Sequence, residues 1–73
     1  MRESHYKEVV CRWLKRAEED LLVARDEIDH VAWASVFHSQ QAAEKALKAL
    51  LIACGKRPPK THRLELLIEL LKR

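Results

Sequence analysis

The sequence predicts an all-α protein, an antiparallel up-and-down bundle of three helices. Apolar residues recur at intervals of three and four, and the 73 residues include only one glycine and two prolines, all between positions 55 and 59. Alternating three- and four-residue spacing is the pattern of a helix with one buried face. We therefore expect two long helices, one loop and a short third helix.

The first helix is expected from about Glu3 to Ile28. One face collects most of its apolar residues, which are Tyr6, Val10, Trp13, Leu14, Ala17, Leu21, Ala24 and Ile28. Asp29 and His30 interrupt this pattern, so the helix should end there. A very short connection to the next helix predicts that the two helices form an antiparallel hairpin.

The second helix is expected from about Val31 to Cys54 and is apolar on two sides. One line of residues holds Trp33, Phe37, Gln40, Glu44, Leu47, Leu51 and Cys54, and a second holds the small residues Ala32, Ser35, Ser39, Ala42, Ala46, Ala49 and Ala53. Only a strip of His38, Gln41, Lys45 and Lys48 is left to face water. Such a helix should lie centrally in the bundle, with neighbours on two flanks. Gly55 should end it.

The third helix should begin near Thr61 or His62, after a loop that Pro58 and Pro59 stiffen. Its core face holds Leu64, Leu67, Ile68 and Leu71, while Leu66 and Leu70 point elsewhere. Three short helices cannot bury this much apolar surface by themselves. We therefore expect the bundle to be completed by dimerisation or by another protein.

Composition excludes several classes of protein. The longest apolar run, Ala49 to Cys54, is too short to cross a membrane, and residues 1–8 lack the apolar core of a signal peptide. Two cysteines cannot form a disulfide framework, so we expect a cytoplasmic protein with reduced thiols. The four histidines have neither the i,i+4 spacing nor the cysteine companions of a metal site, so no metal or other cofactor is expected.

The loop before the third helix carries the strongest cluster of functional groups, Lys56, Arg57, Lys60, His62 and Arg63. The cations, with free amides at a helix start, could bind a phosphate, and His62 could transfer a proton near neutral pH. We accordingly assign Lys56, Lys60 and Arg63 as candidates for contacts to phosphate or nucleic acid. The alternative is that Lys56 and Arg57 complement the dipole at the end of the second helix, and that the rest is a solvated loop.

Two polar residues, Gln40 and Glu44, interrupt the apolar lines of the second helix. They could line a nucleotide pocket, or they could form a hydrogen-bonded layer that fixes the register of the helices. The aromatic residues Trp13, Trp33 and Phe37 are most simply core residues, and they could stack on a base only if such a pocket is open.

The stretch "QQAAEKALK" at 40–48, followed by Gly55 and by Lys60-Thr61-His62-x-Leu64, resembles the HEPN family of prokaryotic helical domains. The resemblance extends from about Cys11 to Leu71. It implies a helical bundle that usually dimerises. It also implies frequent pairing with a small nucleotidyltransferase protein in a system of the toxin–antitoxin type. We expect residues 1–73 to be one domain of this kind.

Many members of the HEPN family are metal-independent ribonucleases, and their arginine and histidine, separated by four to six residues, meet at a dimer interface. Arg57 and His62 match this spacing. The resemblance implies that the ribose 2′-OH attacks the adjacent phosphate, while arginine stabilises the phosphate charge and histidine moves the proton. Members usually continue with one or two further helices, which could hold the catalytic pair instead.

Three functional hypotheses follow from these observations. The first is RNA cleavage, or nucleotide or RNA binding, at a dimer cleft lined by the basic loop. The second is a noncatalytic interaction module that binds a nucleotidyltransferase partner. The third is a fragment whose exposed core causes it to associate.

Overall fold

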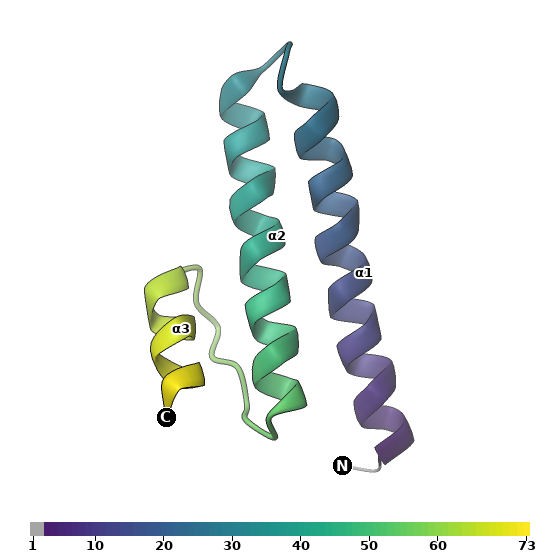
Figure 1. The fold of residues 1–73 in the computed structure, drawn as a ribbon, viewed down its shortest axis with the longest axis vertical. Coiled ribbons are helices and arrows are strands. Elements are labelled where there is room, and N and C mark those ends of the chain that lie inside the picture. Colours follow the sequence, from purple (N-terminus) through teal and green to yellow (C-terminus); the bar gives the residue numbers. More distant parts are fainter. Residues whose placement is uncertain (1–2) are drawn as a thin grey trace.

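The computed structural model describes residues 3–73, apart from the side chains of Glu3, Ser4 and Tyr6. The described part is all-helical and has three helices, α1 (Glu3–Glu27), α2 (Ala32–Ala53) and α3 (Leu64–Lys72). This confirms the predicted all-α class with three helices, and the two long helices end within a residue or so of their predicted bounds. The antiparallel order holds for α1 and α2 only, because α3 runs in the same direction as α2 (Figure 1). The expected place of Tyr6 in the core lies outside the described residues.

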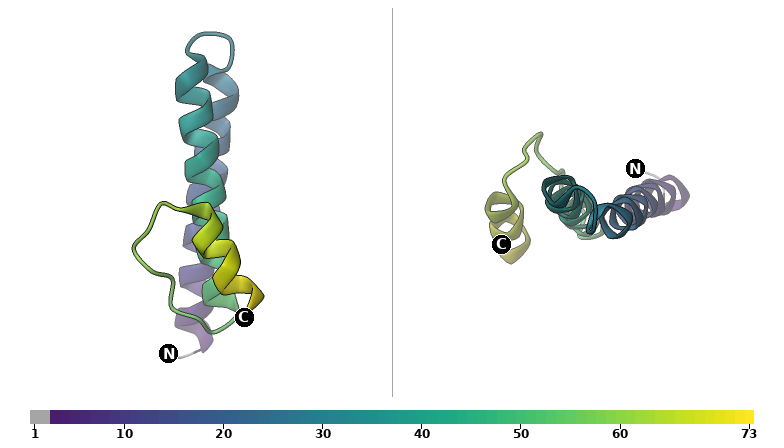
Figure 2. Two further views of the ribbon diagram at one scale, coloured as in Figure 1. Left: turned by 90° about the vertical axis from the view of Figure 1, so that its left-hand side faces the viewer. Right: turned by 90° about the horizontal axis from the view of Figure 1, so that it is seen from above.

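The three helices lie side by side in one layer. α1 and α2 form the antiparallel hairpin, and α3 lies on the opposite side of α2 (Figure 1). Seen from above, the helices form a row, and α1 and α3 make no contact with each other in the described part (Figure 2). The predicted central place of α2 is therefore confirmed. A molecule of 43 × 25 × 16 Å built this way leaves its broad faces uncovered.

The end of α2 is set by Gly55, as predicted. The Gly55 amide donates to the carbonyl of Ile52 at 2.9 Å, and the Lys56 amide donates to the carbonyl of Leu51 at 2.8 Å. This pair of bonds is a Schellman motif, which needs a left-handed residue at its centre, and Gly55 has φ 77°. The motif turns the chain sharply, so that residues 56–63 run back along α2.

The predicted start of α3 at Thr61 or His62 is wrong, because the helix begins at Leu64. Arg63 caps it in an extended conformation (φ −87°, ψ 108°), and its amide donates to the Thr61 hydroxyl at 3.2 Å. His62 stays outside the helix, where its side chain reaches Glu44 of α2. A tertiary contact thus replaces the first turn that the sequence pattern favoured.

Small residues bring α1 and α2 together. Ala17 and Ala24 of α1 and Ala42 and Ala49 of α2 are buried. The Ser35 hydroxyl donates to the backbone carbonyl of Ala24 at 2.8 Å, which requires the two helices to approach closely. Ser35, Ala42 and Ala49 of the line of small residues on α2 are therefore buried, whereas Ala32, Ser39 and Ala53 are exposed.

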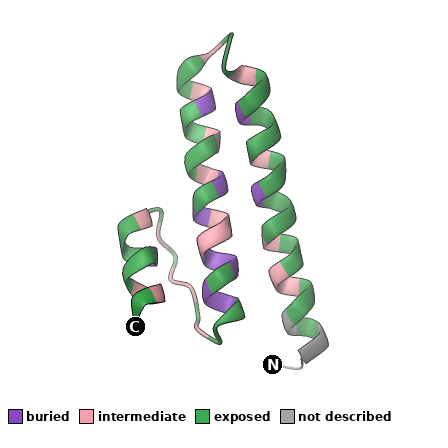
Figure 3. Cartoon of the chain, in the orientation of Figure 1, coloured by how far each residue is buried: buried purple, intermediate pink, exposed green. Residues whose placement is uncertain are grey.

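The buried face of α1 matches the predicted one only in part, and most of the helix surface is exposed (Figure 3). Ala17 and Ala24 are buried as predicted, and Trp13 and Asp20 are half-buried on the same side, whereas Leu14, Leu21 and Ile28 of the predicted face are exposed. The alanines permit a close approach that leaves little room for leucine, so the larger side chains remain at the margin of the interface.

The polar strip predicted to face water instead faces inward, which corrects the expectation for α2. His38 and Lys45 bind Asp20 of α1, and Lys48 is buried with its Nζ 5.7 Å from the ring centre of Trp13. Several apolar side chains of α2 are exposed to solvent instead, and Trp33 is 74% exposed. The core is completed by Leu51 and Leu67, the largest fully buried side chains.

Candidate functional site

A cleft of about 620 Å³ lies between α2 and the segment that leads into α3. α2 contributes Phe37, Gln40, Gln41 and Glu44, and the later segment contributes His62, Leu64 and Glu65. The cleft exists because the extended residues before α3 hold this helix beside α2 (Figure 1). It contains three residues that the sequence had singled out for function: Gln40, Glu44 and His62.

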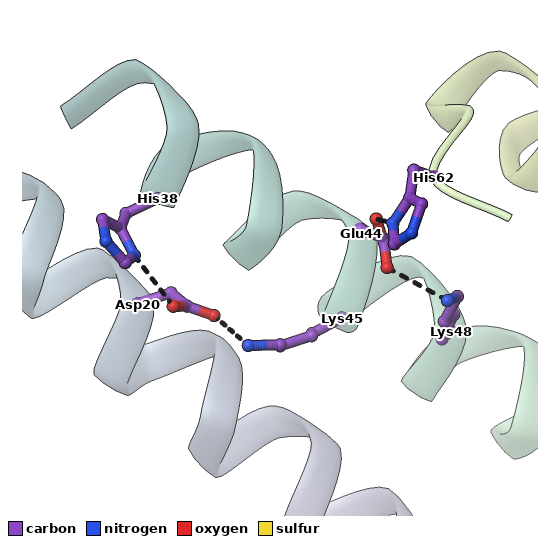
Figure 4. Close-up of polar contacts among 6 residues, drawn as sticks. All are labelled: Asp20, His38, Glu44, Lys45, Lys48 and His62. Carbon is purple, nitrogen blue, oxygen red and sulfur yellow. Dashed lines mark hydrogen bonds and ion pairs between the residues drawn. The ribbon is translucent and has the colours of Figure 1, made fainter. Parts of the chain in front are cut away.

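Glu44 is the buried polar centre of this site. Only 5% of the residue is exposed, and both carboxylate oxygens are hydrogen-bonded (Figure 4). His62 Nδ1 lies 2.8 Å from Oε1, and Lys48 Nζ donates to Oε2 at 3.0 Å. Glu44 and Lys48 thus form an i,i+4 ion pair of the favourable orientation, and His62, from a distant part of the chain, binds the other carboxylate oxygen.

The environment keeps Glu44 ionised. Burial alone would raise its pKa, but the hydrogen bonds from His62 and Lys48 and their positive charge together lower the pKa below its ordinary value of 4.5. An ionised carboxylate only accepts hydrogen bonds, so Nδ1 of His62 must carry the hydrogen. In the neutral imidazole, Nε2 is then the unprotonated nitrogen, which can act as a base.

One ring nitrogen of His62 is hydrogen-bonded to Glu44, and the rest of the ring is accessible to solvent. Its side chain is 84% exposed, although its partner Glu44 is buried. A substrate can therefore reach most of the ring without displacing the bond to Glu44. A fixed tautomer on an accessible imidazole is the arrangement that general acid–base chemistry uses.

The residues of the basic cluster in the loop before α3 make different contacts in the structure. Lys56 Nζ donates to the carbonyl of Leu70 at 2.6 Å, so this side chain holds the last turn of α3. Arg63 Nε donates to Glu65 at 2.8 Å on the surface. The side chains of Arg57 and Lys60 are exposed, and neither residue lines the cleft. Within one chain the cleft therefore brings His62 to Glu44 but not to Arg57.

Asp20 organises a second polar cluster, which sequence reasoning missed. Its Oδ1 accepts from His38 Nδ1 at 3.2 Å, and its Oδ2 accepts from Lys45 Nζ. Burial would raise the pKa of Asp20, but the bonds from Lys45 and His38 lower it below the ordinary 3.8. Spacing could have identified this residue, because Asp20 lies three positions after Ala17 and four before Ala24, on the same helix face. We interpret Asp20 as a residue that links α1 to α2, because both of its partners lie on α2.

Metal-binding clusters and membrane-spanning helices are both absent from the residues that the structure describes. No three His, Cys, Asp or Glu side chains in that part are grouped so that they could hold a metal ion. No helix there is long and apolar enough to cross a membrane. Cys11 and Cys54 are both free and exposed.

Comparison with known proteins identifies the family. The model of the HEPN domain matches residues 10–73. A protein of Methanocaldococcus jannaschii named "Putative toxin MJ1304" is 52% identical over 44 residues, which are 59% of this chain and 29% of that protein. The match thus spans less than a third of that relative's length. No solved structure matches the chain significantly. Because the family model covers most of the sequence, from Val10 to the last residue, the chain belongs to the HEPN domain family.

Proposed function

We propose that this HEPN chain is a toxin-like module that cleaves RNA without a metal ion, using His62 as the group that moves the proton. The observation that carries the proposal is the hydrogen bond from His62 to the buried Glu44, beside a cleft of about 620 Å³. Membership of the family and the printed name of the Methanocaldococcus relative support the toxin-like role.

The proposed reaction begins at the ribose 2′-hydroxyl. Nε2 of His62 takes the hydroxyl proton, the 2′-oxygen bonds to the adjacent phosphorus, and the bond from phosphorus to the 5′-oxygen breaks. The departing 5′-oxygen takes up a proton, which the protonated imidazole can return. The products are a 2′,3′-cyclic phosphate and a 5′-hydroxyl. Glu44 stabilises the imidazolium formed on the way, because its carboxylate stays bound to Nδ1.

Arg57 is proposed to act from a second copy of the chain. It is exposed and does not line the cleft of its own chain, so a guanidinium for the phosphate has to come from elsewhere. The uncovered broad faces provide apolar surface for such a dimer, with Leu14 and Leu21 of α1 and Val36 and Leu50 of α2 all exposed. Ala49 is too deeply buried within the hairpin to contribute.

The test is RNA cleavage by purified variants in the presence of a chelator. His62→Ala and Arg57→Ala should each reduce the cleavage rate by a factor of about 100 or more, because each removes one catalytic group. Arg57→Ala should not change the melting temperature, since its side chain is exposed, whereas His62→Ala should lower it modestly, because it removes one partner of the buried Glu44. His30→Ala, at an exposed histidine in the hairpin turn, is the matched control and should cleave like wild type. Wild-type rates in His62→Ala would exclude the proposed site.

A second candidate function is a noncatalytic module that binds a nucleotidyltransferase protein. The exposed apolar residues of α1 and α2 favour it, because they provide a surface for a different partner as readily as for a second copy. Val36→Lys and Leu50→Lys should then prevent co-purification with the nucleotidyltransferase, while His62→Ala leaves it intact. The reverse result would speak against this function.

A further inference from the structure

We propose that the cleft between α2 and α3 binds one nucleobase of the RNA, and that it prefers a base with an exocyclic amino group, adenine above uracil. The inference rests on the proposed function, because it identifies the substrate group that occupies the site beside His62. Phe37 and Gln40 are the residues that would recognise the base.

Charge separates the place of the base from that of the phosphate. Two carboxylates, Glu44 and Glu65, line the cleft, and the lining includes no lysine or arginine. Lys48 and Arg63 are already paired with these two carboxylates, so the cleft offers no unpaired lysine or arginine to a phosphate. The exposed cations Arg57 and Lys60 lie outside the lining and cannot hold a phosphate inside it. A neutral, flat and polar-edged group therefore fits the interior best.

Phe37 offers a stacking surface. The residue is 49% exposed, and its ring lies nearly perpendicular to that of His38, with the ring centres 5.3 Å apart. The exposed half of Phe37 is the surface on which a base would stack. Stacking of a base on an aromatic ring contributes substantially to single-strand binding, because every base has a π-face. A volume of about 620 Å³ is in the range of small-molecule sites and accommodates a base.

The polar groups around the cleft select among bases. Gln40 and Gln41 bring amides that can both donate and accept, which suits the adjacent donor and acceptor of adenine. The carboxylate of Glu65 already accepts from Arg63 at Oε1, and its further bonds can also only be accepted, so it favours an exocyclic amine and disfavours the O4 carbonyl of uracil. These two features point the same way, toward an amino-bearing base.

The proposed base site lies beside His62, the proposed catalytic residue. His62 lines the same cleft as Phe37, and most of its ring is exposed. A base seated on Phe37 would place its ribose and phosphate at the mouth of the cleft, near the imidazole of His62. The cleft would thus select the nucleotide next to the bond that is cut.

The experiment titrates ¹⁵N-labelled protein with adenosine 5′-monophosphate, uridine 5′-monophosphate and ribose 5-phosphate, and follows the amide signals of the cleft. None of the three has the 3′-phosphodiester that the proposed reaction needs, so binding is measured apart from cleavage. Adenosine monophosphate should bind most tightly and ribose 5-phosphate most weakly. Equal affinity for the three, or no shifts at residues of the cleft, would overturn the inference.

Two variants make the test specific. Phe37→Ala should weaken the binding of adenosine monophosphate by about tenfold or more, because it removes the stacking ring. Trp33→Ala, at an exposed aromatic one turn earlier on α2 and outside the cleft, is the control and should bind like wild type. Gln40→Leu should reduce the preference for adenine over uracil. If Phe37→Ala binds like wild type, the stacking role is wrong.

Failure of this inference can be told apart from failure of the proposed function. Cleavage of RNA that does not respond to the base and is unchanged in Phe37→Ala would reject the base site and retain the ribonuclease. Base-selective binding by a protein that never cleaves RNA would retain the base site and reject the ribonuclease.

Discussion

His62 Nδ1 lies 2.8 Å from the Glu44 carboxylate, although the two residues are 18 positions apart and His62 precedes the helix that the sequence assigned it to. The contact joins an exposed imidazole to a buried acid and fixes the tautomer of the ring. It also sets where α3 begins, because the chain stays extended up to Arg63 while His62 turns toward α2. Fold and candidate chemistry therefore depend on the same bond.

Glu44→Gln is expected to lower the rate of RNA cleavage by about tenfold or more, because an amide stabilises the imidazolium less well than a carboxylate. Glu69→Gln, at an exposed glutamate of α3 outside the cleft, is the matched control. A cleavage rate in Glu44→Gln equal to that of wild type would reduce Glu44 to a structural role.

Mixing the two inactive variants tests the shared site. If Arg57 of one chain serves His62 of the other, a mixed dimer of Arg57→Ala and His62→Ala keeps one intact site and loses the second. Equal mixing should then restore roughly a quarter of wild-type activity, since half of the dimers are mixed. No recovery, with exchange of subunits verified by mass, would place both groups in one chain or exclude one of them.

Acid should unfold this protein through Asp20 and Glu44. The pKa of each carboxyl is lower in the folded chain than its ordinary value, which is 3.8 for Asp20 and 4.5 for Glu44. Each ionised carboxylate therefore stabilises the fold at pH values above its ordinary pKa. The free energy of unfolding should therefore fall as the pH drops through the lowered folded-state pKa values, below about pH 5. Denaturant titrations over this range measure it.

Variants assign that acid sensitivity. Asp20→Asn should lower the free energy of unfolding at neutral pH by about 1–3 kcal/mol, because it weakens the partly buried contacts to His38 and Lys45. It should also lessen the fall in stability on acidification. Glu19→Gln, at the exposed neighbouring position, should do neither. Identical acid profiles of Asp20→Asn and wild type would contradict the assignment.

Leu67→Ala should loosen α3. Leu67 is fully buried, and its truncation should cost about 2–5 kcal/mol, whereas truncation of the 38%-exposed Leu66 should cost much less. Because α3 positions one side of the cleft, the milder Leu67→Val should keep the fold and weaken cleavage more than Leu66→Ala does. Thermal melts and cleavage rates of the three variants check this, and equal effects of Leu66→Ala and Leu67→Ala would contradict it.

The sequence predicted the elements well because periodicity and Gly55 are local signals. Apolar spacing located α1 and α2, and a glycine with φ 77° ended α2. The sequence predicted the buried faces of the helices less well. Apolar spacing placed Leu14 and Leu21 on the buried face of α1, but close packing of alanines decided which side chains are buried, and both leucines are exposed.

The candidate site was only partly predictable. Gln40, Glu44 and His62 were identified singly, yet nothing local indicates that a residue near 44 meets one near 62, because that depends on where the loop folds back. Asp20 was missed because charged residues surround it in the sequence, although its spacing from Ala17 placed it on the buried face. The inward orientation of His38 and Lys45 depends on their contacts with Asp20, so the sequence did not predict it either.

The most direct measurement is the chemistry of the RNA ends. Wild-type protein is incubated with RNA of mixed sequence in the presence of a chelator, and the 3′ ends of the fragments are analysed by mass spectrometry. Attack by the 2′-hydroxyl with His62 moving the proton predicts 2′,3′-cyclic phosphate ends, which His62→Ala should not generate. Intact RNA, or fragments that carry a 3′-hydroxyl, would contradict the proposed mechanism.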